Sequence, residues 1–461
     1  MTPLMIGISI LMTCCLGFAW LSARNSLSAR IATAAVMLSF GYWYLLPALN
    51  IFFIGFDVDQ IEASRDNVAF AFVIVGVFLS LTLFVIMLVP LLWPTSREDR
   101  RRDGPVEILN DRRLSRLGTL LTVSSAAMFI SRFGGDGSEL LLRMALGEVS
   151  ARTNMEFYNI SSGVLSSLDG LWEIANISIC CLLICICTAA RNSYGSTRLL
   201  AIISLVVMFI ATGTRSLVIY VMVAALLTIL ARPKAPRQIR TRADGSSWLK
   251  RLPVILLFLV ATSAAIGAYA SRFQDYELDV GGAVLQTLVG NNDMLRELAA
   301  VLGRIDRYNA VGVSDFIQTP FTFLMPRFLG FDKQIPEHLL IYNRDLMAID
   351  LRYDQGNYFP GLVADFVMVF GPWLGAVALA AFMCAILLVV RGLARRVPGL
   401  VMSTAFIASS MALVFVSVRN IPGSMALSVL ILLSVSCMLA RTRAGVSVPL
   451  QARIIPDARN L

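Results

Sequence analysis

Long apolar runs restrict the possible folds of this chain more than any other feature. A transmembrane helix needs about 20 mostly apolar residues, and eleven segments of the sequence have this character. They are 3–23, 31–55, 68–93, 115–131, 171–190, 198–212, 214–231, 252–270, 361–390, 399–417 and 421–440. The chain is 57% hydrophobic and 15% charged, whereas soluble domains carry about 25% charged residues. We therefore expect one all-α domain, residues 1–461, that is a polytopic integral membrane protein with about 11 transmembrane helices.

Basic residues in the connections predict the orientation of these spans. Two links, 94–116 and 232–251, are strongly basic, and so is the C-terminal tail 441–461. Three shorter links carry Arg24 and Arg30, Arg191 and Arg198, and Arg391, Arg395 and Arg396. Eleven spans place all six basic segments on one face, which the positive-inside rule assigns to the cytoplasm. The N-terminus is then outside and the C-terminus inside, and the net charge of +9 reports topology rather than nucleic-acid binding.

Two long exterior loops, 132–170 and 271–360, hold most of what this topology leaves outside the cytoplasm. Segments 138–149 and 293–305 place apolar residues among charges, so we expect short interfacial helices there. The apolar segment 319–331 can dip back into the membrane where protein covers its backbone. Long loops that a compact membrane core does not need are usually functional.

Arginine is common in these loops, although the positive-inside rule disfavours it there. The loop arginines are Arg132, Arg143, Arg152, Arg272, Arg296, Arg304, Arg307, Arg327, Arg344 and Arg352, against the single exterior lysine Lys333. The planar guanidinium of arginine forms bidentate hydrogen bonds with carboxylates and phosphates, so these arginines predict anion binding. Salt bridges to acidic residues of the same loops are the alternative. Arg215 and Arg419, each on a tight turn between spans, are expected at the depth of lipid phosphates.

Neither a metal nor a cofactor is expected. The eight cysteines all fall inside expected spans, with no metal-ligand spacing to the one histidine. We interpret them as small apolar fillers. The two long exterior loops also contain no Asp-x-Asp sequence of the kind with which soluble transferases often hold a divalent ion.

Two motifs give the chain a resemblance to a known family. A span ends in TGTR at 212–215, and a long exterior loop is followed by NYFPGLVADFVMVFGPWLG at 357–375. This order is similar to oligosaccharide repeat-unit (O-antigen) polymerases of the Wzy type, which are related to O-antigen ligases within the GT-C membrane glycosyltransferases. The resemblance covers about 200–390 and the overall topology.

The resemblance implies roles for particular residues. Arg215 would bind the polyprenyl pyrophosphate, and Asp365 would fill the acidic position after Pro360 and Gly361. Gly371 and Gly375 fill the glycine positions that follow. The histidine that ligases usually carry before the asparagine is replaced here by Gly356, which favours a polymerase over a ligase. Some polymerases also space an arginine and a glycine as Arg152 and Gly163 are spaced here.

Transfer of a glycan from a lipid pyrophosphate needs a stabilised leaving group and a general base. Fixed arginines can do the first without a metal, and Arg215 and Arg419 are the candidates. A carboxylate partly desolvated at a helix start has a raised pKa and suits the second role, which points to Asp365 or to a charge that only complements the helix dipole. Other candidate bases are Asp315, Asp345, Asp350, Asp354 and His338. Candidate substrate-binding residues are Arg152, Arg272, Arg327, Arg344, Arg352, Tyr353 and Tyr358.

The expected function is therefore polymerisation of undecaprenyl-pyrophosphate-linked oligosaccharides at the periplasmic face of a bacterial inner membrane. Expected partners are that substrate, membrane lipids, and chain-length regulator and flippase proteins, with no nucleic acid. The alternatives are a flippase or transporter of lipid-linked oligosaccharide and an O-antigen ligase. A transporter would place ionisable groups near the membrane midplane, whereas here they concentrate at the ends of the spans.

Overall fold

The described part of the chain is helical, as expected, with no strand among its residues. The computed structural model describes Met12 and residues 27–51, 63–92, 111–133, 164–190, 194–212, 216–231, 294–308, 312–314, 337–346, 361–397, 399–415 and 422–440. Five helices are long and apolar enough to cross a bilayer: Ala29–Leu49, Arg65–Leu88, Asp111–Ser131, Leu171–Ala189 and Pro372–Ala394. The chain is thus a helical, multi-pass membrane protein.

The helices fall close to the apolar runs of the sequence. In chain order they are α2 (Leu27–Phe40), the π-helix η2 (Gly41–Leu45), α3 (Leu46–Leu49), α4 (Arg65–Leu92), α5 (Asp111–Phe133), α8 (Val164–Ala189), α9 (Gly195–Thr212), α10 (Ser216–Ala231), α13 (Met294–Leu302), the 3-10 helix η7 (Ile305–Tyr308), α15 (Glu337–Leu346), α16 (Leu362–Phe370), α17 (Pro372–Ala394), α18 (Leu400–Phe415) and α19 (Pro422–Ala440). The expected span 252–270, and the span 3–23 apart from Met12, lie outside the described residues. The count of eleven spans and the orientation stay predictions.

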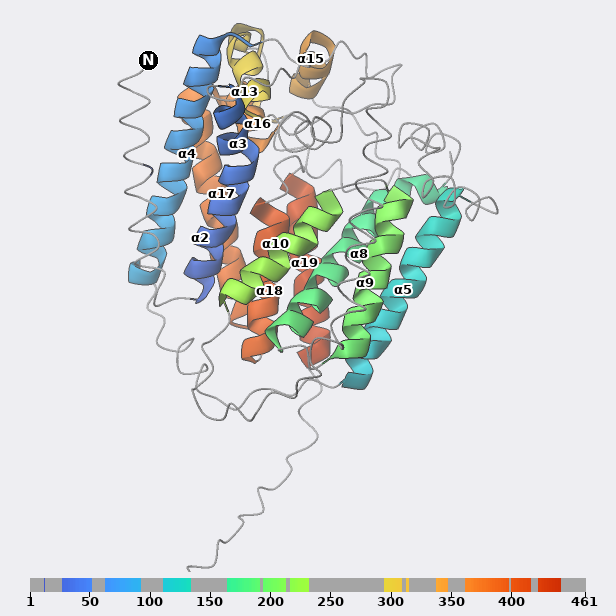
Figure 1. Ribbon diagram of the computed structural model, residues 1–461. Helices are drawn as coiled ribbons and strands as arrows, with labels where there is room; N and C mark the ends of the chain where they lie inside the picture. The colour runs from blue at the N-terminus through green and yellow to red at the C-terminus, as the bar shows by residue number, and fades with distance from the viewer. Residues whose placement is uncertain are drawn as a thin grey trace, which may run out of the picture.

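Helix α8 lies at the centre of one half of the bundle, where it packs against α5, α9, α10, α18 and α19 (Figure 1). Cys180, Cys181, Cys185 and Cys187 on this helix are fully buried and free. These four side chains thus pack inside the bundle, where Cys180 Sγ donates to the Ala201 carbonyl at 3.4 Å.

Short polar contacts join α5 to its neighbours. Trp172 of α8 donates through Nε1 to Ser124 of α5 at 2.7 Å, and the hydroxyls of Thr122 and Ser204 lie 3.0 Å apart between α5 and α9. Small residues and hydroxyls let membrane helices approach closely. A Cβ on Gly118, near the start of α5, would lie 3.2 Å from Leu200 near the start of α9. The starts of α5 and α9 therefore lie at the same end of the bundle, as the basic character of the links before them predicts.

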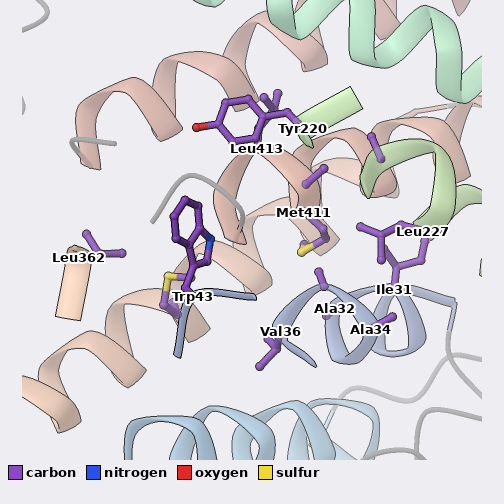
Figure 2. Close-up of a cluster of buried hydrophobic side chains, with 14 of the residues drawn as sticks. Ile31, Ala32, Ala34, Val36, Trp43, Tyr220, Leu227, Leu362, Met411 and Leu413 are labelled. Carbon is purple, nitrogen blue, oxygen red and sulfur yellow. The ribbon is translucent and has the colours of Figure 1, made fainter. Parts of the chain in front are cut away.

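Helices α2, α10 and α18 enclose a second part of the core. Figure 2 shows the buried cluster in which Ile31 of α2, Leu227 of α10 and Met411 of α18 meet. Helix α2 continues into η2, where the Leu46 N–H donates to the Gly41 carbonyl five residues earlier. This π turn contains Trp43 and Tyr44, and both side chains are buried, at 5% and 3% exposure.

The expected span 361–390 is not one helix, which corrects the sequence interpretation. Gly371 adopts φ +80° and ψ 171°, a conformation open essentially to glycine alone, and Pro372 then begins α17. The chain doubles back so that α16 packs along the first half of α17, with the rings of Phe366 and Phe382 5.6 Å apart. A Cβ on Gly375 would lie 2.7 Å from the Phe366 carbonyl. Gly371 and Gly375 are thus explained by local structure, since they permit the hairpin.

Candidate functional site

Four short elements form a layer at one end of the bundle. This short-helix layer consists of α13, η7, α15 and α16, and Figure 1 shows its three labelled helices near the top of the view, level with the upper part of α4. Helix α13 packs on α4, and a Cβ on Gly303 would lie 2.6 Å from the Asn67 amide nitrogen near the start of α4. The layer thus gathers segments from two regions of the chain that the sequence assigned to an exterior loop and to the start of a span.

Helix α13 confirms the expected helix in 293–305 but is not interfacial. Every residue from Met294 to Leu302 except Arg296 is buried. Its buried residues include Glu297, at 6% exposure. The start of α13 also contacts the start of α16, because a Cβ on Gly361 would lie 2.6 Å from the Met294 sulfur. The helix is therefore an inserted part of the fold rather than one that rests on a lipid surface.

Two candidate acid–base residues from the sequence come together in this layer. His338 lies in the first turn of α15, and Asp365 in the first turn of α16. His338 Nε2 is 3.7 Å from Asp365 Oδ1, and the two side chains are 2% and 13% exposed. His338 thus lies on a short helix within the long connection 271–360. This helix, α15, packs against α16 and η7.

The surroundings of Asp365 favour its neutral form. Burial raises the pKa of the Asp365 carboxyl well above the usual aspartate range, because a charge in an apolar setting loses its hydration. Its Oδ1 accepts no hydrogen bond from the described residues. A buried carboxyl beside an imidazole can hold and exchange a proton near neutral pH, as a general base must.

A second polar group lies at the other end of α15. The Asp345 carboxylate accepts from Arg307 Nη1 at 2.7 Å and from Arg344 Nε at 3.0 Å. Arg304 Nη1 donates to the Asp345 carbonyl. Burial raises the pKa of Asp345, but the hydrogen bonds from Arg307 and Arg344 outweigh this and hold it below the usual range. We call these four residues the guanidinium cluster.

The cluster decides between two of the candidate bases. Asp345 is committed to arginines and its pKa is lowered, so it is a weak base. Asp365 touches no arginine in the described residues, and its pKa is raised. Of the two described aspartates among the candidates, Asp365 therefore suits proton acceptance.

Most other predicted site residues lie outside the part of the chain that the structure describes. They are Arg152, Arg215, Arg272, Arg327, Arg352, Arg419, Tyr353, Tyr358, Asp315, Asp350 and Asp354. Arg215 directly precedes α10, and only three residues separate α9 from α10, so the tight turn expected there is consistent with the helix bounds. Arg344 is described, and its side chain is 70% exposed.

Two features of the layer escaped the sequence interpretation. Glu297 has no sequence signal of burial, because charged residues on a nine-residue helix normally face solvent. Tyr308, in η7, is 2% exposed and its hydroxyl has no hydrogen-bond partner among the described residues. The described residues contain no group of three or more His, Cys, Asp or Glu side chains able to hold a metal ion.

The chain was compared with protein-family models, with curated proteins and with solved structures, and none of them matches it.

Proposed function

We propose that the chain polymerises lipid-linked oligosaccharide repeat units, with the short-helix layer facing the exterior of a bacterial inner membrane. The observation that carries the proposal is the contact between His338 and Asp365. One residue of this pair stands in the family-like motif, and the other is the only histidine of the chain. Their approach joins the long loop to the motif that follows it.

The exposures divide the roles within the pair. Asp365 is 13% exposed and His338 only 2% exposed, so an acceptor hydroxyl reaches the carboxylate more readily than the imidazole. We assign Asp365 as the general base. His338 is then a positioning residue, which orients the carboxylate and shares its proton.

In the proposed step, Asp365 takes the proton of the acceptor sugar hydroxyl as the hydroxyl oxygen attacks the anomeric carbon of the donor. The bond from that carbon to the pyrophosphate oxygen breaks, and undecaprenyl pyrophosphate leaves with the electron pair. Arg215 and Arg419 are proposed to stabilise the charge that develops on the leaving group. Arginine suits this role because its fork matches two phosphate oxygens at once.

An O-antigen ligase is the second candidate. It is favoured by one observation: a buried histidine does reach the acidic position of the motif, from α15 instead of position 356. The two functions use the same donor and differ in the acceptor, which is a second lipid-linked repeat unit for the polymerase and a lipid A core for the ligase.

The test uses purified protein reconstituted with a lipid-linked repeat unit. A polymerase yields a ladder of longer lipid-linked products, whereas a ligase yields product only when lipid A core is added, and a flippase yields neither. Asp365→Asn should lower turnover by about 10²–10⁴-fold, as loss of a general base does. Asp306→Asn is the matched control, because Asp306 is an exposed aspartate of the same layer. A full ladder from a folded Asp365→Asn protein would remove Asp365 as the base.

A further inference from the structure

The guanidinium cluster holds more positive charge than its structural role requires. Arg304, Arg307 and Arg344 carry three positive charges, and Asp345 supplies one negative charge, which leaves two uncompensated within the described part of the chain. One arginine is enough to cap the last carbonyls of α15, and one more is enough to neutralise Asp345. Asp306, the one acid of η7, forms no ion pair with the three arginines.

The unused donors of the cluster face solvent. Arg307 and Arg344 are 62% and 70% exposed, whereas Asp345 beneath them is 9% exposed. A guanidinium has five N–H donors, and each of these two arginines donates one hydrogen bond to Asp345. Asp345 thus orients the two guanidinium groups, and most of their donors have no partner among the described residues, so they can bind an anion from solvent. Tyr308 is buried next to Arg304, Arg307 and Asp345, and its hydroxyl has no hydrogen-bond partner among the described residues, so the cluster lies on a packed polar side chain.

The cluster and the acid–base pair lie on the same face of one helix. His338 and Asp345 are seven residues apart, which is close to two turns, and Tyr342 between them is fully buried on the same face. The two sites are therefore separated by about 10 Å along α15. A pyrophosphate leaving the carbon attacked beside Asp365 lies one bond from that carbon. An anion held at the cluster is thus a different group.

The geometry points to a second anion subsite, formed by Arg304, Arg307 and Arg344 on Asp345, that binds a carboxylate or phosphate away from the reacting carbon. On the proposed function, which this assignment to a glycan presupposes, the group belongs to the acceptor: an acidic sugar substituent or its own lipid-linked phosphate. An anionic lipid headgroup presents the same chemistry.

The test measures binding of inorganic pyrophosphate to the full-length protein in neutral detergent at low ionic strength. The double variant Arg307→Ala/Arg344→Ala removes the two most exposed guanidinium groups and should weaken binding about tenfold, or 1.4 kcal/mol. Lysine at both positions keeps the charge but loses the planar fork and should restore binding only in part. The control is Arg112→Ala/Arg113→Ala, which removes two exposed arginines at the start of α5. Equal affinity of the cluster variant and the control would overturn the subsite.

Nanodiscs then separate the two sources of the anion. If phosphatidylglycerol nanodiscs, but not phosphatidylcholine nanodiscs, block pyrophosphate binding at the cluster, the subsite belongs to lipid headgroups. If both leave it open, the subsite belongs to the glycan. The binding assay needs no turnover, so a chain that binds pyrophosphate at the cluster but forms no ladder refutes the proposed function and not the subsite.

Discussion

Replacing Gly371 by alanine tests how the break between α16 and α17 positions Asp365. Gly371 has φ +80° and ψ 171°, and no atom lies within 4 Å of an added Cβ. The cost is therefore backbone strain without a clash. Holding a non-glycine residue in such a conformation costs about 1–3 kcal/mol. Relief of that strain would turn α16 relative to α17 and move Asp365 away from His338.

Gly392→Ala is the matched change. Gly392 lies in α17, also has nothing within 4 Å of an added Cβ, and has no positive φ. In a regular helix alanine is favoured over glycine by about 0.8–1.0 kcal/mol. The same added methyl group should thus destabilise the protein at 371 and leave it as stable or more stable at 392.

Thermal unfolding in detergent, followed by the fluorescence of the six tryptophans, measures both effects. We expect a lower midpoint for Gly371→Ala and an equal or higher midpoint for Gly392→Ala. Turnover per folded molecule should fall only in Gly371→Ala, because a displacement of about 1 Å at a reacting group can cost 10²-fold. A Gly371→Ala protein with the wild-type midpoint and turnover would refute the reasoning.

Four further outcomes are expected. Because the pKa of Asp365 is raised, its base form is lost as pH falls through that raised value, so turnover should decline on the acid side at a pH well above the usual aspartate range. His338→Gln should shift this acid limb of the pH profile, and an unshifted limb would contradict the positioning role of His338. The same shift makes folding less favourable as pH rises from the ordinary aspartate pKa toward the raised one, and Asp365→Asn should remove this dependence from the unfolding midpoint. Arg215→Lys should lower turnover markedly in a well-folded protein, since lysine lacks the planar fork of arginine, whereas an arginine that only anchors the topology would tolerate the change. Turnover should also survive a chelator. Loss of turnover in chelator and its recovery on addition of a divalent ion would show that arginines do not replace a metal.

The spans of the bundle could be predicted because burial in lipid requires continuous apolar runs, and those runs are local in the sequence. Helices α4, α9, α10 and α18 begin and end within a few residues of the predicted bounds. The break at Gly371–Pro372 was hidden, since α16 is as apolar as the span that follows it. Glycine before proline was the available signal, as proline favours the first position of a helix.

The candidate site could be predicted only in its members. Asp365, His338 and Arg344 were identified from residue type and order, but nothing in the sequence places α15 against α16, because the segments that join them to the bundle have no periodic pattern. The buried Glu297 shows the same limit. The sequence of a nine-residue helix with one apolar stripe predicts a helix at the protein surface. The burial of its polar face, which carries Glu297, results from tertiary packing alone.

The π turn at η2 has a consequence for chain length. A π turn holds one residue more than the α-helical turn it replaces. Helices α2 and α3 therefore form one continuous rod with an extra residue in Gly41–Leu45. Loss of one residue within 41–45 would restore continuous α-helix there, whereas loss of one residue from the middle of α4 would turn everything beyond it by about 100°. The first described span is therefore the place in this bundle where a single-codon deletion should be tolerated best.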